Sequence, residues 1–159
     1  MNGQKVASAT RRGVLKAAAT LAVGTATIRI VRPAGATSAA MQAAIREVVG
    51  ERPINAGKVV LEIPPLVENG NTVACSVAVE SPMTPADHVR AIHVFNERNP
   101  QPNVIGVYLG PRAGRARFST RIRLADTQKV VAIAQLSDGS FWSDSVDVVI
   151  TLGACLEDS

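Results

Sequence analysis

The sequence predicts an all-β fold, a sandwich of about seven short strands preceded by a short helix and an export signal. Three observations support this prediction. Apolar and polar residues alternate in several stretches, as they do in strands with one buried face. Turn-forming Gly, Pro, Asn and Asp residues separate these stretches at even spacing, which is typical of a β-sandwich. Charge is divided unevenly, because the first 36 residues contain six of the 17 basic residues and no acidic residue.

Residues 1–36 are predicted to be a signal peptide. The segment Thr10–Lys16 is TRRGVLK, which resembles a twin-arginine export signal with Val14 at the usual aromatic position. The Ala-rich stretch that follows is shorter than the ~20 apolar residues that span a membrane. Ala34-Gly35-Ala36 fits a small-x-small cleavage site, so we expect a mature chain from Thr37 that inserts into no membrane. An uncut helical anchor is the alternative.

The remaining chain is close to neutral, with 11 basic residues against 13 acidic ones. Aromatic residues make up only 3% of the sequence, and no basic run occurs beyond the signal. Nucleic-acid binding is therefore not expected.

A short helix and a linker are expected over residues 37–56. Ser38 is a suitable N-cap, and Gly50 and Pro53 mark the end of the helix. Three apolar residues recur at helical spacing and form one packing face: Met41, Ile45 and Val48.

One sandwich domain is expected over residues 57–152. Its seven predicted strands cover residues 58–63, 72–79, 89–95, 104–109, 113–124, 129–136 and 141–152. The segments 68–71, 96–102 and 137–140 are rich in turn-forming residues and are predicted to be turns. The sequence contains no internal repeat and no sign of a second domain.

The fifth predicted strand has the clearest alternation. One face contains Ala116, Phe118, Thr120, Ile122 and Leu124, and the other contains Arg115, Arg117, Ser119, Arg121 and Arg123. Four like charges at alternate positions repel one another. They form either the solvated face of an edge strand or a surface for an acidic partner or an anion.

The sequence contains no recognisable catalytic or metal-binding constellation. The two histidines, His88 and His93, are five residues apart, so they would lie on opposite faces of one strand. We expect surface or edge roles for both. The metal-binding and nucleophile motifs HExxH, CxxC and GxSxG do not occur. We therefore predict no catalytic residue, no metal site and no separate cofactor.

The two cysteines are expected to differ in environment. Cys75 alternates with Val73, Val77 and Val79, so it is predicted to be a small buried apolar residue. Cys155 belongs to residues 153–159, which are expected to form a C-terminal arm. Its small residues Gly153 and Ala154 are expected to give the backbone conformational freedom. A disulfide between the two cysteines is the alternative.

The C-terminal arm is suited to presenting Cys155 to another protein. Five extended residues beyond Ile150 give a reach of roughly 17 Å. Glu157 and Asp158 favour the neutral thiol, so activation of Cys155 is expected to come from the site that the arm enters.

The chain resembles the SoxY family from about Gly57 to Cys155. The matching pieces, in order, are Glu68-Asn69-Gly70, Ser81-Pro82-Met83, Asn99-Pro100, the segment 119–125, Asp138-Gly139-Ser140 with Trp142, and the segment 149–155. Together, behind a twin-arginine signal, these pieces are fairly specific.

The resemblance implies an immunoglobulin-like β-sandwich that forms a heterodimer with a second small sandwich subunit, SoxZ. It further implies a periplasmic carrier, not an enzyme, that holds thiosulfate-derived sulfur covalently on Cys155 while Sox enzymes load, oxidise and hydrolyse it. The family usually ends close to Gly-Gly-Cys-Gly-Gly, whereas residues 153–159 are GACLEDS. Bulk and negative charge therefore follow the cysteine in this chain.

Two other functions are alternatives to a sulfur carrier. The first is an exported immunoglobulin-like interaction module whose Cys155 is incidental or tethers a dimer. The second is a thiol enzyme, which is less favoured because no base or orienting group accompanies Cys155 in the sequence.

The export signal can be tested by substitution. Changing Arg11→Lys together with Arg12→Lys should retain the precursor in the cytoplasm, because the arginine pair is the specific part of the signal. Cell fractionation measures this, with Arg29→Lys and Arg32→Lys as a control that makes the same change outside the motif. Normal export of the first variant would show that the twin-arginine prediction is wrong.

Overall fold

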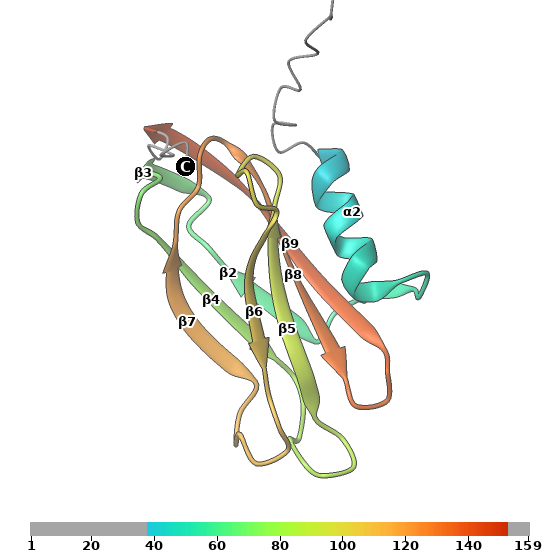
Figure 1. Cartoon of the computed structure of the whole chain (residues 1–159). Helices are drawn as coiled ribbons and strands as arrows, with labels where there is room; N and C mark the ends of the chain where they lie inside the picture. The colour runs from blue at the N-terminus through green and yellow to red at the C-terminus, as the bar shows by residue number, and fades with distance from the viewer. Residues whose placement is uncertain (1–37, 153–159) are drawn as a thin grey trace, which may run out of the picture. The chain divides into compact units, whose positions relative to one another are not determined.

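The computed structural model describes residues 38–152, which form one helix and nine strands (Figure 1). In chain order they are α2 (Ser38–Val49), β1 (Ile54–Ala56), β2 (Val59–Glu62), β3 (Leu66–Asn69), β4 (Val73–Val79), β5 (Val89–Asn96), β6 (Asn103–Tyr108), β7 (Arg117–Ile122), β8 (Gln128–Leu136) and β9 (Phe141–Leu152). The predicted signal peptide and the C-terminal arm lie outside the described residues.

The nine strands form two sheets, which confirms the predicted β-sandwich. The large sheet has the order β1-β9-β8-β5-β6, and β3 also pairs with β9. The three-stranded sheet has the order β2-β4-β7. Alternate side chains of both sheets meet in one core, which is why β4 buries every second residue: Val73, Cys75, Val77 and Val79.

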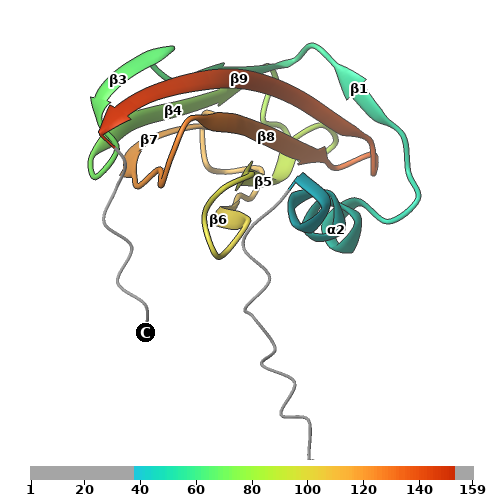
Figure 2. The same cartoon turned by 90° about the horizontal axis from the view of Figure 1, so that it is seen from above.

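Strand β9 connects more elements than any other described strand. One edge of β9 pairs antiparallel with β8, and the other edge pairs parallel with β1 near Phe141 and with β3 near Val149. Figure 2 shows β1 and β3 at opposite ends of β9. Between them, the Asp144 carboxylate accepts a 2.8 Å hydrogen bond from the Leu61 backbone N–H of β2. This bond ties the edge of the three-stranded sheet to the large sheet.

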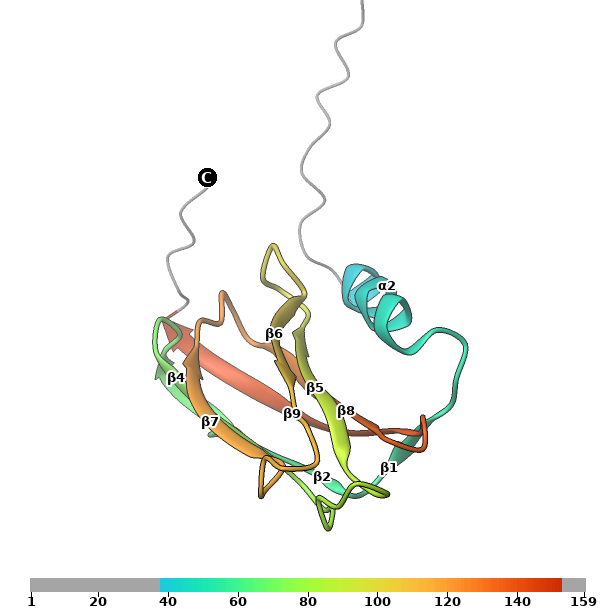
Figure 3. The same ribbon diagram turned by 60° about the horizontal axis from the view of Figure 1, so that its bottom comes forward.

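Helix α2 covers the outer face of the large sheet and is well separated from β4 and β7 (Figure 3). Its buried residues Met41, Ile45 and Val49 pack against three large side chains of that sheet: Phe95, Ile133 and Phe141. The predicted helix and its apolar face are confirmed, with Val49 more buried than the expected Val48. The described part of the chain contains no helix long and apolar enough to cross a membrane.

Two short strands were not predicted. Strand β1 lies where a linker was expected, and β3 overlaps the turn expected at residues 68–71. All three residues of β1 are exposed, and β3 has no buried residue. Neither strand therefore has an alternating pattern, and both form through backbone pairing with β9.

The fifth predicted strand is shorter than expected, covering Arg117–Ile122 instead of 113–124. Gly114 has a φ of +80°, and the Ala113 N–H donates to the Gly110 carbonyl in a turn. This backbone conformation cannot continue as a strand. Arg115 therefore lies before β7, and Arg123 lies just after it.

The buried position of Cys75 predicts the outcome of a serine substitution. Cys75 is 1% exposed, so Cys75→Ser places a hydroxyl among apolar groups and should lower the free energy of unfolding by about 1–3 kcal/mol. The neighbouring Ala74 is exposed, and Ala74→Ser should change it by less than about 0.5 kcal/mol. Urea unfolding of the two variants measures the difference. Equal midpoints would contradict the assigned burial.

Candidate functional site

The C-terminal arm begins at a firmly held strand end. The Gly70 N–H donates a 2.8 Å hydrogen bond to the Leu152 carbonyl, and the Thr151 hydroxyl donates to the Glu68 carbonyl at 3.1 Å. On the other side of β9, the Ile150 N–H donates to the Thr127 hydroxyl at 3.0 Å. The last residues of β9 therefore have partners on both sides. Cys155 comes three residues after Leu152, outside the described residues.

Gly70 also links the end of β9 to the end of β7. Its carbonyl accepts a 2.9 Å hydrogen bond from the Leu124 N–H, while its own N–H is bonded to Leu152. Hydrogen-bonded backbones lie ~4.8 Å apart, so Leu124 and Leu152, both bonded to Gly70, are no more than roughly 10 Å apart. The position from which the arm leaves is thus beside the arginine-rich strand.

The four arginines predicted to form a surface are all exposed: Arg115, Arg117, Arg121 and Arg123. The Arg117 guanidinium is 4.0 Å from the Glu62 carboxylate of β2. In the described part of the chain, no other carboxylate lies within 4.0 Å of any of these four arginines. The backbone near Arg123 is fixed, because the Asn99 side chain donates to the Arg123 carbonyl at 2.7 Å and accepts from the Ala125 N–H at 3.0 Å.

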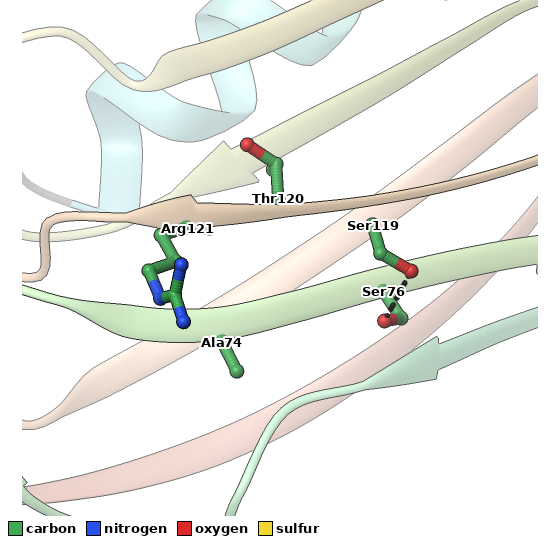
Figure 4. A pocket seen from close by; sticks show the side chains of 5 residues that line it. All are labelled: Ala74, Ser76, Ser119, Thr120 and Arg121. Carbon is green, nitrogen blue, oxygen red and sulfur yellow. Dashed lines mark hydrogen bonds between the residues drawn. The ribbon is translucent and has the colours of Figure 1, made fainter.

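The outer face of the three-stranded sheet contains a hollow beside Arg121. Figure 4 shows the side chains of Ala74, Ser76, Ser119 and Arg121 on one face and that of Thr120 on the opposite face. The Ser76 and Ser119 hydroxyls are 2.8 Å apart across β4 and β7. Because Ala74 and the two serines are small, the guanidinium of Arg121 lies next to open, polar surface.

The hollow was not recognised in the sequence. Alternation in the sequence does place both serines on outward faces. Ser119 lies on the arginine face of the fifth predicted strand, and Ser76 lies on the face opposite that of Cys75. Their proximity depends on the pairing of β4 with β7, which matches Ser76 with Ser119 and Ala74 with Arg121. Sequence alternation does not reveal this register.

Cys75 faces the core and is confirmed as a buried apolar residue, with a free thiol. Burial raises the pKa of the Cys75 thiol to about 11, because the interior disfavours the thiolate. The reactive thiolate form is therefore nearly absent at neutral pH. A disulfide from Cys75 to Cys155 would require the arm to enter the space between the sheets.

The expected surface or edge role is wrong for His93, which is only 6% exposed. His88 precedes β5, whereas His93 lies within it and contacts Phe95 and Tyr108 on the helix-covered side of the large sheet. Gly106 of β6 leaves room for the imidazole, since a Cβ there would lie 3.4 Å from Nδ1 of His93. Desolvation lowers the pKa of His93, which favours the neutral ring.

The buried His93 is not part of a recognisable metal centre. Within residues 38–152, no three His, Cys, Asp or Glu side chains are grouped so that they could hold a metal ion. The predicted absence of a metal site concerns the whole chain and stays a prediction for the residues outside this range.

Comparisons with known proteins agree with the resemblance seen in the sequence. The family model described as "Sulfur oxidation protein SoxY" matches residues 45–155. The structure of the sulfur carrier protein SoxY from Chlorobium limicola f thiosulfatophilum is similar, with a TM-score of 0.61 and 26% identity. That alignment covers 73% of this chain and all of the Chlorobium chain. The comparison with curated proteins gives no match.

Superoxide reductases share the fold at lower identity. The neelaredoxin from Ignicoccus hospitalis has a TM-score of 0.55 and 15% identity, covering 61% of this chain and 94% of its own. A putative superoxide reductase from Thermotoga maritima has a TM-score of 0.51 and 20% identity, covering 62% and 87%. At these identities the likeness concerns the sandwich alone.

Proposed function

This chain belongs to the SoxY family of sulfur oxidation proteins, and from that premise we propose that it carries thiosulfate-derived sulfur covalently on Cys155. The observation that supports this most directly is that the family match extends to residue 155 itself. The likeness to a SoxY sulfur carrier over that protein's whole length supports the same role.

The proposed chemistry needs a thiol that another protein can reach. In the loading step, a Sox enzyme removes two electrons and one proton as the Cys155 sulfur bonds to the outer sulfur of thiosulfate. Hydrolysis with one water then releases sulfate and leaves a persulfide on the cysteine. Cys75 is unsuited to this chemistry, because its thiol is buried and its pKa is about 11.

The chain acts as a carrier subunit and not as an enzyme. Glu157 and Asp158 follow Cys155 closely and favour its neutral thiol. No basic residue lies among residues 153–159 to oppose them. Activation of the thiol therefore comes from the enzymes that bind the arm, and no cofactor is needed besides the sulfur on Cys155.

We further propose that the protein works in the periplasm after export by the twin-arginine route. The motif around Arg11 and Arg12 supports this, as does the change in charge near Ala36. Export in a folded state would allow a partner without its own signal to travel with the chain.

The proposed partner is a SoxZ-type subunit that forms a stable heterodimer with this chain. Co-expression followed by size-exclusion chromatography should give one peak containing both chains in equal amounts. The exposed surfaces available for such contact include the outer face of the three-stranded sheet and the arginines of β7. A chain that elutes as a monomer beside the SoxZ-type subunit would contradict this prediction.

Carriage of sulfur by Cys155 can be tested with Cys155→Ser. This variant should lose all covalent adducts after incubation with thiosulfate and Sox loading enzymes, because serine forms no persulfide or thiosulfonate. Its thermal unfolding should be unchanged, because residue 155 follows β9, the last of the described strands, and belongs to neither described sheet. Intact-protein mass spectrometry detects the adducts.

The matched control is Cys75→Ser, which should keep the adducts although it is less stable. Adducts that persist on Cys155→Ser would overturn the assignment. An unmodified natural protein in the presence of active enzymes would instead favour an interaction module with an incidental or tethering cysteine.

A further inference from the structure

The arginine face and the start of the C-terminal arm are neighbours in the structure. Gly70 is hydrogen-bonded to both Leu152 of β9 and Leu124, which follows the end of β7 by two residues, so Leu152 and Leu124 are no more than roughly 10 Å apart. Figure 1 shows β3, β7 and β9 running toward the same end of the sandwich. An attachment this close puts the arginine side chains within reach of a segment that follows Leu152.

The arginines nearest to this point lack charge partners. Arg121 and Arg123 are exposed, and the described residues place no carboxylate within 4.0 Å of either guanidinium. Glu62 of β2 lies beside Arg117, which is at the opposite end of β7 from Arg121. Adjacent like charges on one strand face repel, so an anionic group beside Arg121 and Arg123 would be stabilised.

The residues that follow Cys155 have the complementary charge. Leu156-Glu157-Asp158-Ser159 contains two carboxylates and no basic residue. Five residues connect Leu152 to Glu157, and at ~3.3 Å each they extend roughly 17 Å. This reach exceeds the roughly 10 Å between Leu152 and Leu124, which is next to Arg123 in the sequence. A tether this short also gives the carboxylates an effective concentration in the millimolar range.

We propose that the outer face of the three-stranded sheet beside Arg121 and Arg123 is the docking surface of the chain's own acidic segment, residues 156–159. The small side chains of Ala74, Ser76 and Ser119 leave this face hollow, so an approaching segment meets no bulky group. The docked segment holds Cys155 near the sheet, and a competing anion or high salt releases it.

The chain's own segment is the preferred occupant because it is already tethered next to the arginines. An acidic partner protein has the same charge complementarity but must bind from solution against the tethered carboxylates. Docking depends on charge and tether length alone, so the proposal stands whether or not Cys155 carries sulfur.

A nitroxide label on Cys155 allows docking to be measured by paramagnetic broadening of backbone amide signals. Cys75 is buried with a pKa of about 11, so labelling is confined to Cys155. We expect broadening at Ser119 and Arg121 in β7 and at Ser76 in β4. These three residues lie inside β7 and β4, further from Leu152 than the ends of the strands. An arm that is not docked would mainly approach the strand ends. The amides of α2 provide an internal reference.

Removal of the charges should release the label. Glu157→Gln with Asp158→Asn should reduce the broadening at Ser119 and Ser76 by roughly two- to five-fold, as expected for exposed ion pairs. About 1 M salt should have a similar effect, since the screening length falls to ~3 Å. Arg46→Gln on α2 is the matched control for charge and should leave the broadening unchanged.

Charge exchange completes the test. Arg121→Glu with Arg123→Glu should abolish the broadening, and adding Glu157→Arg with Asp158→Arg should restore it. Equal broadening at Ser119 in the natural chain and in the Glu157→Gln, Asp158→Asn variant would overturn the proposal. It would also be overturned if the arginine variants lost binding to a partner protein while the broadening stayed the same.

Discussion

The pairing of β9 on both of its edges is the constraint on which the rest of the structure depends. Antiparallel pairing with β8 places β9 within the large sheet, and parallel pairing with β1 and β3 closes the edge that would otherwise be free. The bond from Leu61 to Asp144 connects β9 to the second sheet as well. Loss of the pairing of β9 would expose the edge of the large sheet. It would also remove the strand to which the C-terminal arm is attached.

The two sheets differ in what covers their outer faces. Helix α2 buries much of the outer face of the large sheet, which gives β5 buried residues on both sides. Burial within the sheet lowers the pKa of His93. No described element packs on the outer face of the three-stranded sheet, where the arginines and serines remain accessible. The same fold therefore has one face that stabilises the protein and one that is free for charged contacts.

The sequence was informative wherever one face of an element is buried. Alternation identified β4 and placed Cys75 in the core, and helical spacing identified α2. The exposed strands β1 and β3 have no such pattern, because only backbone pairing with β9 defines them. The burial of His93 was missed for a related reason, since a period of two does not reveal a second layer on the opposite face.

The candidate site was predictable as a set of residues but not as an arrangement. The arginines of the fifth predicted strand and Cys155 were identified from residue type and position. Their proximity follows from Gly70, which comes directly after β3 and is hydrogen-bonded to Leu152 of β9 and to Leu124 after β7. It also follows from the register of β4 with β7. Such contacts join residues as far apart in the sequence as Ser76 and Ser119 or Gly70 and Leu152, and local patterns carry no information about them.

The dependence on β9 has a consequence for biosynthesis. The strands β1 and β3 pair with a segment that follows them by more than eighty residues, so neither can reach its final position before β9 has been translated. Such non-local pairing delays folding until β9 has been synthesised. Because β9 ends three residues before Cys155, a ribosome that stops early releases a chain that can neither complete the sandwich nor present the thiol. Proteolytic removal of unfolded chains would then leave a pool in which almost every folded molecule carries its cysteine.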